Sequence, residues 1–538
     1  MPICLRDLRN IASPLNYHLA CRRGQRMLFR YHEIPTLPPL AWGARVDRGS
    51  DVVPVFHGMF VETHSRGFIE GAWDDSFASL NFIAATIVAG TGGIPEHDRV
   101  RFTTSTDPHG PLFSIVKARS VYVSNSPAFV MTMSGEEPDD IYPFYDYDLL
   151  RIYRQGLYCP NGHLRLRSAS PLRVHFMTVI TIDERGSVRF DRHRLCEAPR
   201  DYQAYKEQLL EGTRRVLENG ADPARKPRYG PLASLSRGYD STAATALARS
   251  AGCAETFTYI DDRRRDPKRD SGASNARFFL GMRCKAYSRW QYLALDSCPE
   301  AEFGYVAVNS MVPLAAVEDQ LPGRVLILGD FGDTIWDPKA AKVSNHLSRP
   351  WVKHTHGLSA IEFRLRVGYL AFAPATIAAR HNRIIHDIAT SEAMRPWSVG
   401  GGYDRPIPRR IAEEAGLPRD RFGIHKAASS QSLLSDPSRF SEKGLDHYRR
   451  FVSERHAEIP RPIYNYWRAR ARWCHYLWTN TNGHDDRRYV HSTLMQRHFP
   501  FTLNAKAARI PWDYMFTFQW TVASMRSRYA LPQVPVHA

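Results

Sequence analysis

Apolar residues follow a strand-like pattern in the first part of the chain. Up to about residue 200, short runs rich in Val and Phe stand between turn-forming residues, as in "DVVPVFHGMFVE" from Asp51 and "SVYVSNSPAFVMTM" from Ser120, which is typical of strands. In "FMTVITIDERGSVRFD" (Phe176–Asp191), two β-rich runs flank Asp-Glu-Arg-Gly and predict a hairpin. We therefore expect a mostly β structure in this part.

The period of the apolar positions changes at Asp201, where an amphipathic helix is predicted to begin. Its apolar residues share one helical face, and Gly220 is a suitable stop. The residues on that face are Tyr202, Tyr205, Leu209 and Val216. After this helix, an apolar run from Pro231 enters a polar turn and then an Ala-rich helical segment.

Strands and helices continue to alternate beyond this turn. "ETFTYI" (Glu255–Ile260) and the apolar run from Arg324 are predicted to be buried strands, and Ser274–Cys284 is predicted to be a helix between them. The alternation indicates a parallel α/β sheet from about 205 to 340. From about 355 the chain is predicted to be mainly helical, and the aromatic residues of the tail from 440 are expected to face the core.

The composition indicates a globular, basic protein. The chain has 538 residues, 43% of them hydrophobic, and a net charge of +17. This excludes a disordered chain, and the charge suits nucleic acid, an anionic membrane or acidic ligands. The basic residues are spread along the chain, and even the densest run, Asp261–Asp270, is interleaved with acids. An exposed loop is therefore favoured there over a nucleic-acid-binding arm.

Cysteine usage and hydropathy indicate a cytoplasmic protein. None of the eight cysteines forms a C-x-x-C pair, which fits a reducing compartment and indicates no structural zinc site. The first residues carry charges within their apolar stretch, unlike a signal peptide. The least polar stretches, such as Tyr369–Ala379, are too short to span a bilayer. We expect no membrane partner, and a homodimer is compatible with the sequence.

The turn after the first predicted strand of the sheet carries phosphate-binding chemistry. Ser236 and Ser241 offer hydroxyl donors, and Gly238 permits close approach of the backbone. Amide groups at the head of a helix carry positive partial charge and bind phosphate. Asp240 would be repelled by phosphate, so it suits a magnesium ion that bridges carboxylate and phosphate.

A second acidic turn follows the strand that begins at Arg324. Gly329-Asp330-Phe331-Gly332-Asp333 again combines glycine with carboxylates after an apolar run. Ligands of an open parallel sheet bind beyond the carboxyl ends of its strands, so Asp333 is expected to be a second ligand of the same metal. The chain has no G-x-x-x-x-G-K-[ST] segment, which excludes a P-loop NTPase.

These turns resemble motifs of the asparagine synthetase family, which includes β-lactam synthetases and lasso-peptide cyclases. Ser236–Ser241 is similar to the pyrophosphate loop S-G-G-x-D-S, and Leu328–Asp333 is similar to S-G-E-G-A-D. "SEAMRPWS" (Ser391–Ser398) resembles E-x-R-V-P-F, and Arg409–Ser429 resembles the terminal L-P-x-x-x-x-x-R-x-K segment. "DPHGPLF" (Asp107–Phe113) resembles the R-D-P-x-G motif of the family's glutaminase domain.

The resemblance implies an α/β fold in three parts. Residues 1–200 would be an Ntn-type αββα sandwich, a remnant of the glutaminase domain. Residues 201–440 would be an ATP-pyrophosphatase synthetase domain of the adenine nucleotide alpha hydrolase-like type, with a parallel sheet, and residues 441–538 a helical extension packed on it. Position 2 is Pro2, where a working glutaminase needs a nucleophilic Cys. Glutamine hydrolysis is therefore not expected.

The resemblance also implies an activity: amide-bond formation by an AMP-forming carbon–nitrogen ligase that uses ATP and Mg²⁺. A small-molecule or peptide carboxylate would be adenylated with release of pyrophosphate, and ammonia, an amine or an amine of the same substrate would then attack. The residues expected to bind ATP are Ser236, Arg237, Gly238, Tyr239, Asp240, Ser241 and Gly329.

The same resemblance suggests the remaining roles. Asp240 and Asp333 would hold Mg²⁺, and Lys426 would stabilise the oxyanion or the leaving group. Glu392, oriented by Tyr369, would be the general base for the amine.

Two departures from the family pattern leave other functions open. Arg237 replaces a glycine of the pyrophosphate loop, and Thr334 stands where the family usually has an acid. A non-catalytic binding protein is therefore one alternative. The other is a tRNA-modifying enzyme with the same loop, which would suit the net charge, although nucleic acid is disfavoured because the motifs at Asp107–Phe113 and Ser391–Ser398 are those of synthetases.

Overall fold

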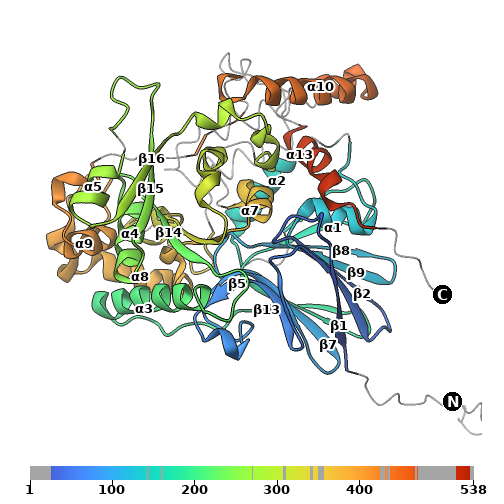
Figure 1. The fold of residues 1–538 in the computed structure, drawn as a ribbon, viewed down its shortest axis with the longest axis horizontal. Coiled ribbons are helices and arrows are strands. Elements are labelled where there is room, and N and C mark those ends of the chain that lie inside the picture. The colour runs from blue at the N-terminus through green and yellow to red at the C-terminus, as the bar shows by residue number, and fades with distance from the viewer. Residues whose placement is uncertain are drawn as a thin grey trace, which may run out of the picture.

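The computed structural model describes most of the chain. It covers residues 26–532 with gaps at 141, 143, 159–161, 270, 307–309, 340–342, 349–356, 425–429, 432, 434–436, 467–468 and 470–515. The first part of the chain forms two sheets, and the second part forms a third sheet surrounded by helices (Figure 1). The fold is therefore mixed α/β, as predicted.

The first two sheets pack face to face. One has the order β1 (Leu28–Glu33), β3 (Val52–His57), β2 (Trp42–Asp47), β9 (Ser120–Ser124), β8 (Leu112–Lys117), β11 (Leu172–His175), β10 (His163–Leu164). The other has the order β13 (Val188–Arg192), β12 (Thr178–Asp183), β7 (Arg99–Thr103), β6 (Val88–Pro95), β5 (Gly67–Trp73), β4 (Glu62–His64). Trp42 of the first sheet packs between Phe68 and Phe102 of the second, with ring centroids 4.8 and 5.7 Å apart.

The predicted hairpin at Phe176–Asp191 is confirmed, since β12 and β13 pair antiparallel with Ile180 opposite Phe190. The strand prediction from Ser120 is wrong in its second half, where α1 (Pro127–Ser134) forms instead. Ser126 caps this helix by accepting a hydrogen bond from the Phe129 amide at 3.1 Å, and Pro127 stands at its first position. A capping Ser followed by Pro is a helix-start signal, and here it prevails over the β-forming residues.

The helix predicted from Asp201 is confirmed as α3 (Tyr202–Gly220). Asp201 caps it by accepting from the Ala204 amide at 2.8 Å, and the predicted apolar face is buried. α3 contacts β5 of the second sheet and also α4 (Tyr239–Ser250) of the later part. It therefore joins the two parts of the chain.

The predicted parallel sheet is confirmed and is larger than expected. Its order is β16 (Arg283–Ser288), β15 (Glu255–Ile260), β14 (Gly230–Ser234), β17 (Arg324–Ile327), β18 (Leu370–Phe372), and all neighbours are parallel. From β14 the chain builds outward to β16 on one side and later continues with β17 and β18 on the other. The strand order therefore reverses between β14 and β17. Ligands of open parallel sheets bind at such a reversal point.

Two predictions in this region are wrong. The helix expected over Ser274–Cys284 ends early, since α5 covers Ala273–Phe278 and β16 begins at Arg283. Gly281 between them has a φ of 59°, a left-handed conformation that ends a helix and that glycine adopts without strain. β18 lies within a stretch predicted to be helical, beyond the predicted limit of the sheet.

Helices make up most of the remaining described chain, in agreement with the prediction. They include α2 (Tyr145–Gln155), α6 (Gly332–Ile335), α7 (Ile361–Val367), α8 (Asn382–Thr390), α9 (Pro406–Glu414), α10 (Glu442–Glu458) and α13 (Thr517–Met525). Aromatic residues of the tail do face the core: Trp520 of α13 is fully buried and packs on Tyr448 of α10 with centroids 5.2 Å apart.

The buried carboxylate of Glu362 connects three parts of the chain. It accepts hydrogen bonds from Ser126 at 2.7 Å, from Tyr305 at 2.5 Å and from Tyr529.

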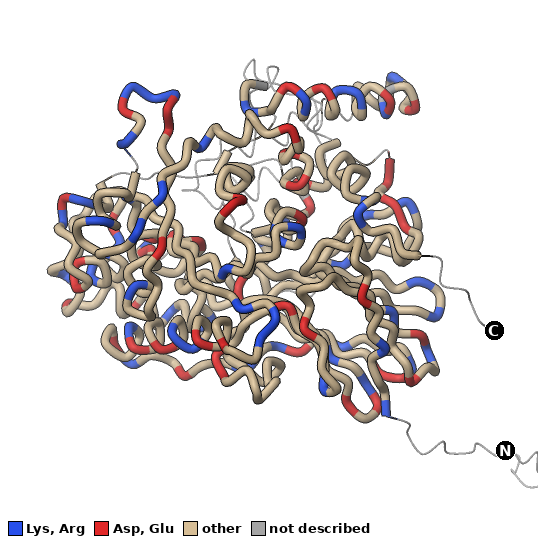
Figure 2. Tube along the Cα trace, viewed as in Figure 1, with Lys and Arg blue, Asp and Glu red and all other residues tan. Residues whose placement is uncertain are grey.

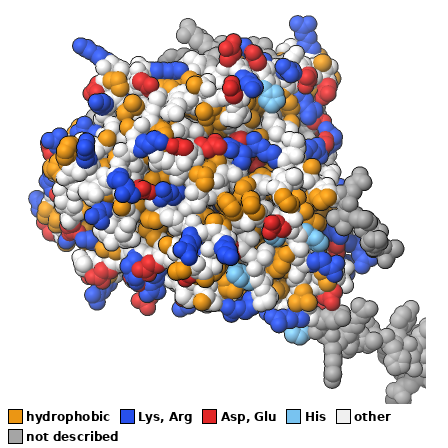
Figure 3. All heavy atoms as spheres, viewed as in Figure 1, with side chains coloured by type: hydrophobic (Ala, Val, Ile, Leu, Met, Phe, Trp, Pro, Cys, Tyr) orange, Lys and Arg blue, Asp and Glu red, His pale blue; other side chains and the backbone are white. Residues whose placement is uncertain are grey.

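Charge is mixed over the molecule. Basic and acidic positions are mixed along the trace in Figure 2, and side chains of both signs are interspersed on the face seen in Figure 3. Within the described ranges, no helix has the length and apolar character needed to cross a membrane.

Candidate functional site

The turn between β14 and α4 is held together by its own hydroxyl groups. The Gly238 amide donates to Ser236 Oγ at 3.1 Å, and the Ser236 amide donates to Ser241 Oγ at 3.2 Å, while the two hydroxyls are 2.6 Å apart. Thr242 Oγ1 donates to the Gly238 carbonyl at 2.6 Å. The turn is therefore preformed, with hydroxyls and amides gathered at the head of α4.

The two side chains of the turn that lie next to Gly238 are engaged within the protein. Tyr239 is fully buried, and its hydroxyl accepts a hydrogen bond from Arg409. The Arg237 guanidinium donates to the carbonyl of Arg421 at 3.1 Å, and the Arg237 carbonyl accepts from the Gly423 amide at 2.8 Å. Tyr239 therefore anchors the turn from inside, and Arg237 lies at its edge.

The second acidic turn lies directly on the head of α4. A Cβ atom at Gly329 would be 2.3 Å from the Ser241 nitrogen, and one at Gly332 would be 2.6 Å from Cγ of Asp240. Only glycine permits so close an approach. The two turns, far apart in sequence, thus form one surface that carries both Asp240 and Asp333.

Phe331 between these glycines is buried with a φ of 67°. Such a conformation is strained for a bulky residue, and strain of this kind concentrates at functional sites. Next to it, Thr334 donates to Asp333 Oδ1 at 3.4 Å. Thr334, whose position carries an acid in the motif that this turn resembles, therefore contacts the carboxylate of the second turn.

Arg405 is a member of the site that sequence reasoning missed. Its guanidinium forms an ion pair with Asp240, and its side chain is only 3% exposed. Burial opposes its charge, but the carboxylates of Asp240 and Asp333 outweigh burial and raise the pKa of Arg405 above its ordinary value. A cation of the chain therefore stands where a metal ion was expected.

The two carboxylates are sufficient for magnesium only if a phosphate takes part. Among the described residues, no group of three or more His, Cys, Asp or Glu side chains could hold a metal ion. Mg²⁺ is commonly bound by one or two carboxylates together with phosphate oxygens and water. Asp240 and Asp333, next to the hydroxyl-lined turn, fit that kind of site and do not form a metal cage of their own.

His109 connects the sandwich to the second turn. Its Nε2 lies 3.0 Å from Asp330 Oδ2 and its Nδ1 lies 3.3 Å from Asp107 Oδ2. Asp107 also accepts from the amide of Ala373, directly after β18, at 3.1 Å. Burial alone would lower the pKa of His109, but the two carboxylates raise it to about 10. The motif at Asp107–Phe113 is therefore where the first part of the chain meets the parallel sheet.

The raised pKa of His109 implies that the free energy of unfolding depends on pH. Because the pKa of His109 is raised, its contribution to the free energy of unfolding is complete below about pH 6.5 and is lost as pH rises towards about 10. Stability should fall by up to about 1.4 kcal/mol per pH unit in that window. His109→Gln should remove this slope in urea unfolding, and the exposed His97 gives a control in His97→Gln, which should keep it. An unchanged slope in His109→Gln would contradict the assignment.

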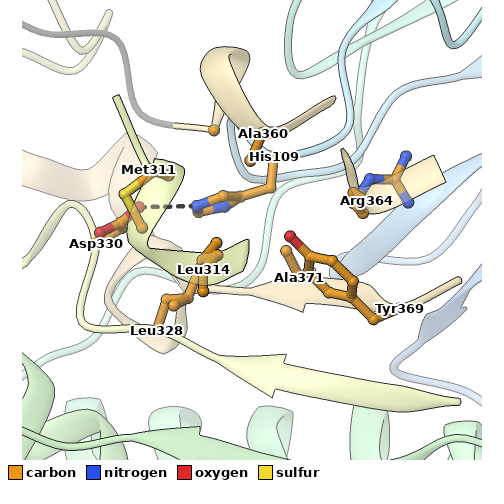
Figure 4. A pocket seen from close by; sticks show the side chains of 10 residues that line it. His109, Met311, Leu314, Leu328, Asp330, Ala360, Arg364, Tyr369 and Ala371 are labelled. Carbon is orange, nitrogen blue, oxygen red and sulfur yellow. Dashed lines mark hydrogen bonds and ion pairs between the residues drawn. The ribbon is translucent and has the colours of Figure 1, made fainter. Parts of the chain in front are cut away.

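A pocket lies beside His109, between the sandwich and the parallel sheet. Tyr369, the residue before β18, is buried, and burial raises the pKa of its hydroxyl, which is directed into the pocket (Figure 4). Arg364 also lines the pocket, and its guanidinium donates to Glu70 of β5 at 2.7 Å. The other lining residues are Met311, Leu314, Leu328, Asp330, Gly357, Ala360 and Ala371.

The remaining predicted catalytic residues do not join this group. Glu392 is on the surface, with its side chain 84% exposed and paired with Arg395 at 3.0 Å, so Tyr369 in its buried pocket does not orient it. Lys426 and Pro2 lie outside the described residues.

Neither the models of protein families nor the curated proteins include a match to this chain. The function is therefore inferred from the site itself.

Proposed function

We propose that the chain is an ATP-dependent, AMP-forming carbon–nitrogen ligase similar to asparagine synthetases. It activates a carboxylate as its adenylate, releases pyrophosphate, and lets an amine or ammonia form an amide. The observation that carries this proposal is the meeting of the two acidic turns between β14 and β17, where the position of Gly329 against the Ser241 amide leaves no room for a side chain.

Each residue of the two turns has a role that its position supports. The hydroxyls of Ser236 and Ser241, with the amides at the head of α4, bind the pyrophosphate portion of ATP. Asp240 and Asp333 would hold Mg²⁺, and the ion would supply positive charge that neutralises the leaving pyrophosphate. Gly329 and Gly332 keep the second turn close enough for both carboxylates to act on one ion.

The layers of the fold support the family's domain plan. Two face-to-face sheets, with α1 against β8 and β9, are consistent with an Ntn-type sandwich over residues 1–200, and α3 of the following domain packs against β5. The five-stranded parallel sheet is consistent with an ATP-pyrophosphatase domain over 201–440, and α10 and α13 with a helical extension over 441–538. Within this plan the sandwich no longer hydrolyses glutamine, so the amine reaches the site from solution or belongs to the substrate.

The general base of the amide step is the weakest of the inherited roles. Glu392 is exposed and paired with Arg395, so it would serve as base only for a substrate bound at that surface. Adenylation precedes the attack of the amine, so this first step does not need the general base that deprotonates the amine. Glu392→Gln should therefore leave ATP–pyrophosphate exchange within about twofold of the wild-type rate, and a larger loss of exchange would show that Glu392 contributes to the nucleotide site.

The experiment that tests the proposed function is ATP–[³²P]pyrophosphate exchange with a panel of amino-acid and peptide carboxylates. Adenylation is reversible, so the right carboxylate should promote incorporation of label into ATP in the presence of Mg²⁺. Absence of exchange with every carboxylate, together with absence of AMP formation, would contradict the ligase.

A non-catalytic nucleotide-binding protein is a second candidate. The ion pair of Arg405 with Asp240 favours it, because that contact competes with a metal ion. Such a protein would bind ATP without forming AMP, and the same assay distinguishes it. RNA modification is less well supported, because acidic positions lie among the basic ones along the coloured part of the trace in Figure 2.

A further inference from the structure

The segment Ser398–Arg405 covers the head of α4. Asp404 closes this segment on itself, accepting from Ser398 Oγ at 2.5 Å and from the amides of Val399 and Gly400 at 3.1 and 2.9 Å. Gly400 and Gly401 have φ values of 71° and 79°, and a Cβ atom added at either residue would meet no atom within 4 Å. We call Ser398–Arg405 the cover segment: a compact loop whose glycines lie in open space.

Two side chains of the cover segment contact groups of the first turn that a bound nucleotide or metal ion would also contact. The hydroxyl of Tyr403 accepts from the Tyr239 amide at 3.3 Å, at the head of α4. Arg405 pairs with Asp240. An amide and a carboxylate of the proposed nucleotide site are therefore both satisfied from within the chain.

The charges explain why an internal cation is needed. Asp240 and Asp333 belong to turns that touch, and two carboxylates at one partly buried place repel each other unless a cation lies near them. Arg405 is buried and is influenced by both carboxylates. Its ring contact with Tyr403, 5.3 Å from guanidinium to centroid, joins the two covering groups into one unit.

Resting on the proposed function, we propose that Arg405 is the built-in counterion of the ligand-free site. It neutralises Asp240 and Asp333 until a divalent cation replaces it. When the cover segment moves, Tyr403 also releases the Tyr239 amide, which can then donate a hydrogen bond to phosphate. The cover segment therefore makes metal and polyphosphate bind together: either one alone must compete with a contact that the segment already makes.

The test is Mn²⁺ binding to the nucleotide-free chain, followed by electron paramagnetic resonance. Arg405→Met removes the competing cation and should bind Mn²⁺ at least about tenfold more tightly than the wild type, and Mn²⁺ should raise its melting temperature more than that of the wild type. Adding Asp240→Asn to this variant should cancel the gain. Arg419→Met is the matched control: Arg419 lies beyond α9 and pairs with Glu413 at 2.8 Å, so its loss should leave the affinity unchanged.

Equal or weaker Mn²⁺ binding by Arg405→Met would overturn the proposal. If that variant does not fold, Tyr403→Phe replaces it: loss of the hydroxyl should increase the affinity for Mg²⁺–pyrophosphate about threefold or more, and an unchanged affinity would overturn the proposal. Failure of the ligase is separate. Exchange could be absent while Mn²⁺ binding still responds to Arg405, or present while it does not.

Discussion

Asp240→Asn is expected to slow ATP–pyrophosphate exchange by about 10²–10³-fold. The substitution keeps the shape of the side chain and removes its charge, so one of the two carboxylates carried by the touching turns no longer attracts the metal. Initial rates of exchange with the most active carboxylate measure the effect.

The matched control for this variant is Asp420→Asn. Asp420 is close in sequence to the segment that borders the first turn, but its side chain is 75% exposed and lies 3.6 Å from Arg421. Its loss should leave exchange at the wild-type rate. Equal rates in Asp240→Asn and the wild type would remove Asp240 from the metal site.

Gly329→Ala is expected to lower the free energy of unfolding by about 2–3 kcal/mol. Its new methyl group would be 2.3 Å from the Ser241 nitrogen and 2.6 Å from the Ser241 Cα, and backbone on both sides leaves nothing flexible to move. The second turn would have to separate from α4, so exchange should be lost as well. Urea unfolding followed by circular dichroism measures the stability.

Gly238→Ala is the comparison for this prediction. Gly238 lies in the first turn with a φ of −77°, and its nearest neighbours to an added Cβ, Ser236 Oγ and Tyr403 Oη, are at 3.4 and 3.5 Å. It should unfold within about 1 kcal/mol of the wild type. Equal free energies of unfolding for Gly329→Ala and Gly238→Ala would contradict the close packing of the two turns.

Local signals explain which elements could be predicted. The helix α3 has both its cap at Asp201 and its periodic face within its own sequence, and the hairpin of β12 and β13 is fixed by its turn. β16 and β18 were missed because short strands depend on their neighbours: β18 has three residues and is a strand only because β17 lies beside it. The sequence from Ser126 contained a cap that the β-forming residues obscured.

The site divides in the same way. Both acidic turns follow apolar strands directly and could be located from the sequence. Arg405, Tyr403 and His109 could not, because each reaches the turns from a distant segment and only the packing of the helices and of the sandwich brings them there. For Tyr403 and Arg405, the sequence offers one local signal, the Gly-rich and Arg-rich run that begins at Ser398. Glu392 was chosen by motif, and its exposure depends on tertiary structure.

A double-mutant cycle on Mn²⁺–ATP binding tests most directly whether the two turns form one site. Asp240→Asn and Asp333→Asn should each weaken binding by about tenfold or more, and the double variant should be little weaker than either single variant, because both carboxylates act on one ion. The shared site would be contradicted if the double variant lost affinity by the product of the two single losses, as expected for independent sites. It would also be contradicted if neither single variant lost affinity.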